Sequence, residues 1–544
     1  MPTSEPIEPQ PALIPRRAFL AGLVATAVAA GCSGGGDDED DPPVGGTGDS
    51  TPDTVADLPP VPPSLPAELF ALGVASGDPL PDSVILWTRL VNDPLADGGG
   101  VPDLPLPVRW ELAADRDFDD IVASGDVVAE PALAHSLHVD ASGLQPDSWY
   151  WYRFSVGDSA SPVGRTRTAP EPGAEVDRLR FAFASCQEYQ SGYWPAHEHL
   201  AAEDIDLVVF LGDYIYEGSP TPGAVRTLQG DDPVDLAGYR RRFGEYKADP
   251  SLQASHAHVP WLTTWDDHEV QNNYAGSVPQ DQDGPSDAFD ERRAAAYQAY
   301  YEHMPVRIEP PDGAQVTLYR SLQWGELLRF YVLDGRQYRS DQACAVPRDV
   351  GLACAEVADD ERTMLGDEQE AWLADELADS DATWNVLAQQ TIMSKIAVPL
   401  GTDEGLNLDQ WDGYPAARRR LVDQLREVDN PVVITGDIHS SGVAVVTDDP
   451  DDVTSAALVP ELVGTSISSM FPAGLAALVT AAASASPNIS YVEPTRRGYV
   501  VCDVTPAALQ ASFRYVATTA TPQAALSTGA RWTIAAGDPQ PRAV

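Results

Sequence analysis

The sequence predicts an α/β domain whose helices cover a sheet, preceded by a small all-β domain of the immunoglobulin or fibronectin type. Between residues 66 and 170, alternating segments such as SVILWTRL and WYWYRFSV are separated by Pro, Gly and Asp, which is typical of an antiparallel β-sandwich. From residue 178 to 520, continuous apolar runs such as DLVVFLGD and PVVITGDIHSS end in polar clusters. Such runs indicate strands buried on both faces, and the segment from Asp290 to Met304 has helical spacing. Residues 521–544 are expected to be a C-terminal tail.

Length and composition fit two globular domains. The chain has 544 residues, of which 43% are hydrophobic and 22% charged, enough to bury a core in each domain. Its formal net charge is -49, from 83 acidic and 34 basic residues, and such a surface repels the phosphates of a nucleic acid. We therefore expect no nucleic-acid-binding surface. An enzyme this acidic that binds an anionic substrate has to mask its own field, and bound cations are the simplest means.

The first 32 residues predict an export signal. Arg16–Arg17 precedes an apolar run, Ala21–Ala30, which is the layout of a twin-arginine signal and is too short for a permanent membrane span. We expect recognition by the twin-arginine export machinery and an extracytoplasmic location. Cys32 follows a Gly, as in a lipoprotein; it is either lipidated, which would anchor the protein to a membrane, or an incidental residue of a cleaved signal. Residues 33–65, rich in Gly, Asp and Pro, are predicted to be a disordered tether.

A first candidate motif, GDYIYE, follows the apolar run Leu207–Leu211. Asp213 comes directly after the strand-like run and its Gly, and Tyr216 three residues later, so both can lie at the rim of the sheet, where sites form. The two oxygens of Asp213 can bridge two metal ions. The motif alone also fits a turn aspartate followed by a packed tyrosine.

A second motif, WDDHE, follows the apolar segment WLTTW. Capping of a helix N-terminus would explain Asp266 and Asp267, but it leaves His268 unexplained. Asn272 and Asn273 follow the motif.

Two further motifs also end strand-like runs. In GDIHSS, Asp437 and His439 alternate, so on an extended backbone both would point to the same side. In RFAFASC, Cys186 is either a core thiol or a soft metal ligand.

The four motifs, in order with SGDP, VILWTRL, LDGRQYR and DGYPAARRRL, resemble the PhoD-like alkaline phosphatases, a family of the calcineurin-like metallophosphoesterases. The resemblance covers nearly the whole ordered chain and implies a metallophosphoesterase-type β-sandwich flanked by helices. The wider superfamily has Asp-x-His, GDxxD, Gly-Asn-His and Gly-His-x-His at these places. This chain departs from each motif, at Cys186, Tyr216, Asp267 and Asp437. The departures agree with the PhoD-like subfamily.

Ligand hardness predicts two different metal ions. One half-site offers a thiolate, a phenolate, an imidazole and a shared carboxylate, from Cys186, Tyr216, His439 and Asp213. This set suits Fe³⁺. The other half-site offers only carboxylates, from Asp213, Asp267 and Asp437, and suits Ca²⁺. The resemblance implies the same pairing, and Zn²⁺ or another divalent pair is the alternative.

These ligands predict an exported, metal-dependent phosphoesterase that hydrolyses phosphate monoesters, diesters or both by a metal-activated hydroxide, with Asp213 between the ions. His268 is expected to act in catalysis, by protonating the leaving alkoxide or by hydrogen bonding to the phosphate, rather than primarily as a ligand. Asn272 and Asn273 are candidates for substrate contact, with loop capping as the alternative. Arg336 either lines the substrate cleft or braces it through buried ion pairs. The competing functions are a phospholipase D-like phosphodiesterase and a surface-anchored binding protein with a structural metal site.

The remaining cysteines have separate expected roles. Cys344 and Cys354 lie close together in a loop-like stretch of an exported chain and predict a disulfide. Cys502, in the strand-like YVVCDV, is expected to be a buried free thiol.

Overall fold

The computed structural model of the protein describes residues 58–544, apart from residues 281–283, 346–349, 397, 401–402, 451, 453 and 473. The expected export signal, Cys32 and residues 33–57 of the expected tether lie outside this part of the chain. Of the helices in the described part, none is long and apolar enough to cross a membrane.

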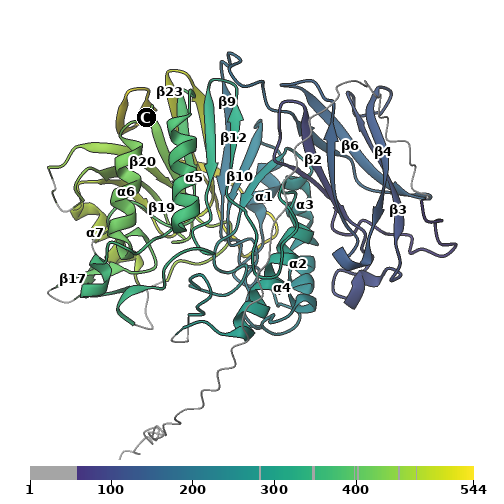
Figure 1. Ribbon diagram of the computed structural model, residues 1–544, viewed down its shortest axis with the longest axis horizontal. Helices are drawn as coiled ribbons and strands as arrows, with labels where there is room; N and C mark the ends of the chain where they lie inside the picture. Colours follow the sequence, from purple (N-terminus) through teal and green to yellow (C-terminus); the bar gives the residue numbers. More distant parts are fainter. Residues whose placement is uncertain are drawn as a thin grey trace, which may run out of the picture. The chain divides into compact units, whose positions relative to one another are not determined.

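Two large mixed sheets form the body of the molecule (Figure 1). The first has ten strands, in the order β25 (Asp538–Ala543), β24 (Leu526–Ala535), β23 (Ala508–Val516), β22 (Arg497–Thr505), β9 (Leu179–Ala184), β10 (Leu207–Leu211), β11 (Trp261–Thr264), β1 (Val74–Gly77), β2 (Ser83–Arg89) and β5 (Ser136–Ser142). The second has seven strands, in the order β12 (Arg320–Trp324), β13 (Leu328–Val332), β15 (Trp384–Ala388), β18 (Pro431–Thr435), β20 (Ala457–Val463), β19 (Ser441–Thr447) and β21 (Ile489–Glu493). Neighbours β9, β10 and β11 pair in parallel, as do β13, β15, β18 and β20.

Two smaller sheets complete the strand set. One consists of β14 (Val350–Gly351), β17 (Asp403–Asn407) and β16 (Val398–Leu400). The other consists of β4 (Ile121–Ala129), β3 (Leu106–Ala113), β6 (Trp149–Val156) and β7 (Ser159–Ala160), with β8 (Gly164–Arg167) paired to β6.

Successive side chains of the central strands enter different cores, because neighbouring residues of a strand point to opposite faces. Val209 and Leu211 of β10 pack between the two large sheets with Phe330 of β13. Val208 and Phe210 of the same strand pack on the other face, against the helices. The result is a sandwich of two sheets with helices outside it, so the predicted α/β class is confirmed. Each buried side chain of this size contributes about 1.5–3 kcal/mol to folding.

The helices cover the outer faces of the two sheets. They are α1 (Pro195–Leu200), α2 (Leu236–Lys247), α3 (Pro250–His256), α4 (Asp287–His303), α5 (Gly366–Ala378), α6 (Pro415–Leu425) and α7 (Ala476–Ala485). Local chemistry fixes their starts: Asp235 accepts a hydrogen bond from the amide of Gly238, and Ser286 accepts one from Phe289, which satisfies first-turn donors. The helix expected from residue 290 to 304 is confirmed as α4.

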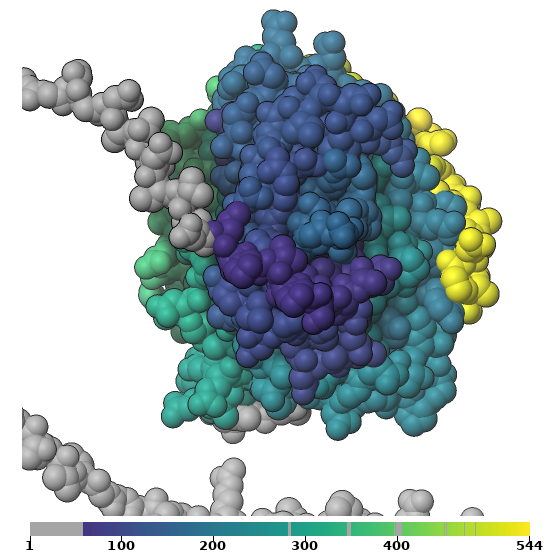
Figure 2. Space-filling model, turned by 90° about the vertical axis from the view of Figure 1, so that its right-hand side faces the viewer, coloured from purple at the N-terminus to yellow at the C-terminus, as the bar shows by residue number. Residues whose placement is uncertain are grey.

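The N-terminal strands form two facing sheets, as expected for residues 66–170, but one of these sheets is not separate. Strands β1, β2 and β5 continue the ten-stranded sheet, and β3, β4 and β6 pack over them around a shared apolar core. The junction pairs Gly77 of β1 with Trp261 of β11. A Cβ at Gly77 would overlap the carbonyl oxygen of Pro305, so only glycine allows this approach. Figure 2 shows the purple and blue N-terminal segment over this side of the molecule.

The expectation of a C-terminal tail for residues 521–544 is wrong. Strands β24 and β25 lie at the edge of the ten-stranded sheet (yellow in Figure 2). Ile534 belongs to the core between the large sheets, and Trp532 packs against it. The segment LSTGARWTIA alternates between better and less buried positions, so the period of two was present in the sequence.

Candidate metal centre and active site

The four candidate motifs meet at one rim of the sandwich. Cys186, Asp213 and Asp267 follow β9, β10 and β11 of the ten-stranded sheet, and Asp437 follows β18 of the facing sheet. Because parallel strands run in one direction, their carboxyl ends share an edge. The sequence prediction that these residues lie past strand ends at a common rim is confirmed.

The backbone at this rim is left-handed at five candidate residues. Their φ values are 58° for Cys186, 56° for Asp213, 51° for Asn273, 56° for Asp437 and 56° for His439. Non-glycine residues seldom adopt this conformation, which costs of the order of 1 kcal/mol each or more. The expectation that an extended backbone aligns the side chains of GDIHSS is therefore wrong. Both side chains still reach the site, because the chain turns sharply at each of them.

The position before Asp213 is occupied by a glycine for a steric reason. Gly212 has φ 101°, and a Cβ there would overlap the backbone nitrogen of Asp266. The loops after β10 and β11 therefore touch through backbone. Glu269 fastens this contact, because its carboxylate accepts hydrogen bonds from the amides of Asp213, Tyr214 and Asp266.

Four groups that can bind a metal ion, a thiol, a phenol, an imidazole and a carboxylate, gather on one side of the site. The Tyr216 hydroxyl donates to Asp213 Oδ2 at 2.7 Å and lies 3.0 Å from His439 Nε2. The Ser469 hydroxyl lies 2.8 Å from the Tyr216 oxygen. Donor atoms of Cys186, Asp213 and His439 all lie within 4.8 Å of one another. The structure therefore brings together the four residues that were expected at the soft half-site.

Carboxylates gather on the other side of the site. Oxygens of Asp213, Asp266, Asp267 and Asp437 all lie within 4.8 Å of one another. Three of these residues are almost fully buried, and Oδ1 of Asp213 and Oδ1 of Asp267 have no hydrogen-bond partner in the described structure. Buried, unpaired carboxylate oxygens are costly unless a cation is bound. Burial raises the pKa of Asp437 to about 7.

Arg336 braces the carboxylates and does not line the cleft. Its side chain is 0% exposed; it pairs with Asp266 and binds both oxygens of Asp409 at 2.9 Å. Its Nη2 lies 3.7 Å from Asp267 and 3.6 Å from Asp437. The candidate role of Arg336 in substrate contact is therefore wrong, because it is buried behind the acidic residues.

The site fits bound cations. Four buried carboxylates, from Asp213, Asp266, Asp267 and Asp409, and the partly exposed carboxylate of Asp437 face two guanidinium groups, from Arg336 and Arg339. Burial, with the charge of Asp213, also raises the pKa of the Cys186 thiol and of the Tyr216 phenol well above their usual values. Both groups hold their protons unless a cation stabilises the anions.

His268 stands beside this cluster with its orientation fixed. Its ring stacks on Tyr216 with centroids 4.1 Å apart, and its Nδ1 lies 2.7 Å from Glu217 Oε2. Burial lowers its pKa, but the carboxylates of Glu217, Asp267 and Asp213 outweigh burial and raise it well above the usual value. Its Nε2 has no hydrogen-bond partner among the residues that the structure describes.

Asn272 and Asn273 are held in their loop by hydrogen bonds from their backbone amides. The amide of Asn272 donates to Glu217 Oε1 at 2.7 Å, and the amide of Asn273 donates to Asp267 Oδ2 at 2.6 Å. Both residues also line the cavity that contains the donors.

Sequence reasoning missed the groups that hold the ligands in place. Glu217 and Glu269 are the last residues of the motifs GDYIYE and WDDHE. A carboxylate so close to a buried strand could have indicated that it binds backbone amides or a neighbouring side chain. Gln410, which donates to Asp437, and Ser469, which reaches Tyr216, come from distant loops. Their sequence neighbourhoods carry no such signal.

A cavity of about 330 Å³ opens over the donors. Its polar lining consists of Asp213, Asp267, His268, Asn272, Asn273, Ser394, Asn407, Asp409, Gln410, Asp412, Asp437 and His439. The rest of the lining is largely aliphatic and includes Ile396, Ile438, Phe471 and residues of α7.

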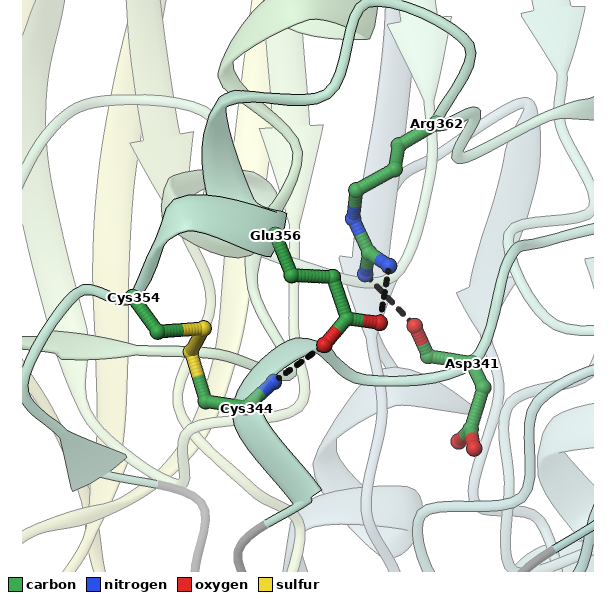
Figure 3. The surroundings of a disulfide bond; sticks show 5 residues. All are labelled: Asp341, Cys344, Cys354, Glu356 and Arg362. Carbon is green, nitrogen blue, oxygen red and sulfur yellow. Dashed lines mark hydrogen bonds and ion pairs between the residues drawn. A yellow bond between two sulfur atoms is a disulfide. The ribbon is translucent and has the colours of Figure 1, made fainter.

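The predicted disulfide between Cys344 and Cys354 is confirmed. Figure 3 shows its surroundings: Glu356 accepts a hydrogen bond from the Cys344 amide at 3.0 Å and lies beside Arg362. The loop that this bond closes carries Val350, which lines the cavity. Cys502 is a buried free thiol, as expected.

Comparison with known proteins identifies the family. Residues 181–513 match the PhoD-like phosphatase family, and residues 58–170 match the PhoD-like phosphatase N-terminal domain. Alkaline phosphatase D of Bacillus subtilis (strain 168) is 46% identical over 482 residues, which cover 86% of this chain and 81% of that protein. A solved structure of PhoD matches with a TM-score of 0.84 at 45% identity and covers 89% of this chain and 93% of that chain. The chain therefore belongs to the PhoD-like phosphatase family and is a hydrolase of phosphoester bonds.

Proposed function

We propose that this phosphoesterase is exported and metal-dependent, and that it hydrolyses phosphate monoesters, diesters or both. The observation that carries metal dependence is the excess of carboxylates over guanidinium groups at the rim, with Oδ1 of Asp213 and Oδ1 of Asp267 left without a hydrogen bond in the described structure. The proposal places the protein in the metallophosphoesterase superfamily, with an immunoglobulin-type arrangement of its N-terminal strands. The twin-arginine pattern and Cys32 support export, with lipidation as an anchor.

The donor chemistry favours Fe³⁺ in one half-site and Ca²⁺ in the other. Cys186, Tyr216 and His439 would hold the iron, and Asp267 and Asp437 the calcium, with Asp213 shared. Zn²⁺ or another divalent pair is the alternative. Bound ions would neutralise the phosphoryl oxygens and activate water for in-line attack.

The chain's own residues supply the remaining chemistry. His268 is held by Glu217 through Nδ1 and lines the cavity, so it is placed to donate a proton to a leaving alkoxide. Asn272 and Asn273 help to fix the loop that carries His268 and line the cavity beside it. Arg336 keeps the carboxylates together, because it is the cation that contacts both the Asp266 and Asp409 side chains.

Metal removal tests the proposal. Exhaustive chelation should abolish hydrolysis of chromogenic monoester and diester substrates, and added calcium should restore part of it, because an all-oxygen site exchanges faster than one with a thiolate. Full activity of protein shown to be metal-free by elemental analysis would contradict the proposal.

Two substitutions separate the roles within the site. Asp213→Asn should lose both ions, because one carboxylate serves both half-sites. His268→Ala should keep its metal content but lose turnover, most on poor leaving groups. Asp503→Asn, which removes a surface carboxylate paired with Arg178, is the control and should change neither.

The largely aliphatic part of the cavity lining favours a second candidate, a phospholipase D-like phosphodiesterase. Such an enzyme would use the same hydrolytic centre on an ester with an apolar part. A binding protein with a purely structural metal site does not fit a member of a phosphatase family, and metal donors that line an open cavity are typical of a catalytic site.

A further inference from the structure

The segment from Leu462 to Val492 differs in composition from the rest of the chain. It contains 31 residues with no Asp, Glu, Lys, Arg or His, and it is the longest such stretch of a chain that is 22% charged. Within it, Met470, Leu475 and Leu478 are exposed at 56%, 46% and 39%. On an otherwise acidic surface, a group of exposed apolar side chains often marks a site of contact with a ligand or partner.

This segment passes the candidate metal centre. It leaves the end of β20, and Ser469 then contacts both the Tyr216 hydroxyl and the Cys186 carbonyl. Phe471 follows, then α7, and the segment ends in β21 at the edge of the seven-stranded sheet. In Figure 1, α7 lies at the left-hand edge, at the end of the molecule far from the N-terminal strands.

One cavity joins the donors to the uncharged segment. Phe471, Leu475, Leu478 and Val479 line it together with Ile396 and Ile438, and the same cavity is lined by the candidate metal ligands. We call these six residues the aliphatic wall. A phosphate held at the ligands would therefore have mainly hydrocarbon along this side, and Asp412, the acidic residue of the lining next to Ile396, is paired with Arg418.

The composition of the aliphatic wall limits what can lie against it. A sugar, a polyol or a nucleobase would lose hydrogen bonds to water there without regaining them, at a cost of about 1–3 kcal/mol for each unpaired group. An alkyl chain gains by leaving water. A packing role alone does not explain Leu475 and Leu478, because α7 keeps them partly exposed at the cavity instead of burying them.

We propose that the aliphatic wall is a binding subsite for the hydrocarbon chain of an amphiphilic phosphate ester, taken up as a single molecule. This inference rests on the proposed function, because the phosphate of that ester is placed at the metal ligands. The chain lies along Phe471 and α7 and leaves the cavity past Leu478. The specificity of the enzyme then depends on the apolar length attached to the phosphate.

A series of n-alkylphosphonates, from methyl to decyl, tests the subsite below the critical micelle concentration. Each compound is measured as a competitive inhibitor of a chromogenic monoester and, directly, by calorimetry. A buried methylene should strengthen binding about fourfold, so affinity should rise steadily and then level off where the chain leaves the wall. Affinity that is independent of chain length in the native enzyme overturns the proposal.

Variants locate the effect on the wall. Leu478→Ser and Leu475→Ser should flatten the dependence on chain length, and Leu478→Met, which keeps the apolar area, should preserve it. Val234→Ser removes a valine that is 62% exposed and does not line the cavity; it should leave the dependence unchanged. Equal flattening by Leu478→Met and Leu478→Ser would assign the effect to the fold of α7 and overturn the subsite.

The readouts separate this inference from the proposed function. Binding of methylphosphonate and hydrolysis of short esters without any gain from longer chains would leave the function standing and remove the subsite. Calorimetric chain-length dependence without hydrolysis would support the subsite and remove the function. Binding that appears only above the micelle concentration would point to a lipid surface as the partner and overturn binding of a single chain.

Discussion

Glu217→Gln tests whether His268 acts as a charged proton donor. Glu217 uses one carboxylate oxygen to hold His268 Nδ1 at 2.7 Å and the other to accept the Asn272 amide at 2.7 Å. Glutamine has the same shape and keeps one acceptor for Asn272. It replaces the oxygen that faces the imidazole with an amide group, which cannot stabilise an imidazolium. The substitution therefore removes a charge and leaves the local packing in place.

The size of the effect follows from this hydrogen bond. A bond between a carboxylate and an imidazolium contributes about 1.5–3 kcal/mol. If all of it supports proton donation, turnover on an alkyl ester should fall about 10- to 150-fold. A p-nitrophenyl ester needs no proton on its leaving group, so its turnover should fall by no more than about threefold.

Turnover on a p-nitrophenyl and an alkyl phosphate, with metal content measured in the same samples, distinguishes the two outcomes. The matched control is Glu269→Gln, a buried carboxylate of the same loops that accepts three backbone amides and does not line the cavity. This control should lower both rates together, because it loosens the loop that carries Asp213. An equal loss on both substrates for Glu217→Gln, with metals retained, would refute proton donation by His268.

Three other predictions concern colour, the disulfide and acid stability. If Tyr216 binds ferric iron as a phenolate, the purified protein should absorb visible light and Tyr216→Phe should shift or bleach the band; a colourless, iron-free and fully active enzyme would exclude this ligand. Replacing Cys344 and Cys354 together by serine should lower stability by about 2–3 kcal/mol, and an unchanged melting temperature would show that the loop is held by other contacts. Burial lowers the pKa of His138 from 6.5 to about 4, so the unfolded chain binds a proton that the folded one does not, and stability should fall as the pH drops from 6.5 towards 4. His138→Gln should reduce that dependence in acid-unfolding curves, and an unchanged slope would mean that this histidine is not responsible.

The strands of the central sheets were predictable because their hydrophobicity is continuous. The run Leu207–Leu211 coincides with β10, since a strand covered on both faces leaves no room for polar residues. The C-terminal strands were missed for the opposite reason. In β24, which lies next to the edge strand β25, better and less buried positions alternate, and the many Ser, Thr and Gly residues there resemble a tail.

The candidate metal ligands could be predicted from the sequence, whereas the groups that balance their charge could not. Asp213 and Asp437 follow strands directly, so the sheet alone brings them together. Arg336 and Asp409 reach the same cluster from loops 73 residues apart. No local pattern predicts that one arginine is fully buried and another exposed, because burial of a guanidinium depends on carboxylates that arrive from elsewhere in the chain.

The left-handed residues show why local preference fails at this rim in particular. After a strand, glycine is the residue that turns the chain in this way without cost, yet Cys186, Asp213 and Asp437 occupy such positions. A glycine there would relieve the backbone but would provide no donor atom. The side chain is needed at the turn because the residues of the strand before it are buried in the cores on either side of the sheet. The conformational cost is therefore located where the ligands are, and an expectation based on extended backbone is bound to fail at those residues.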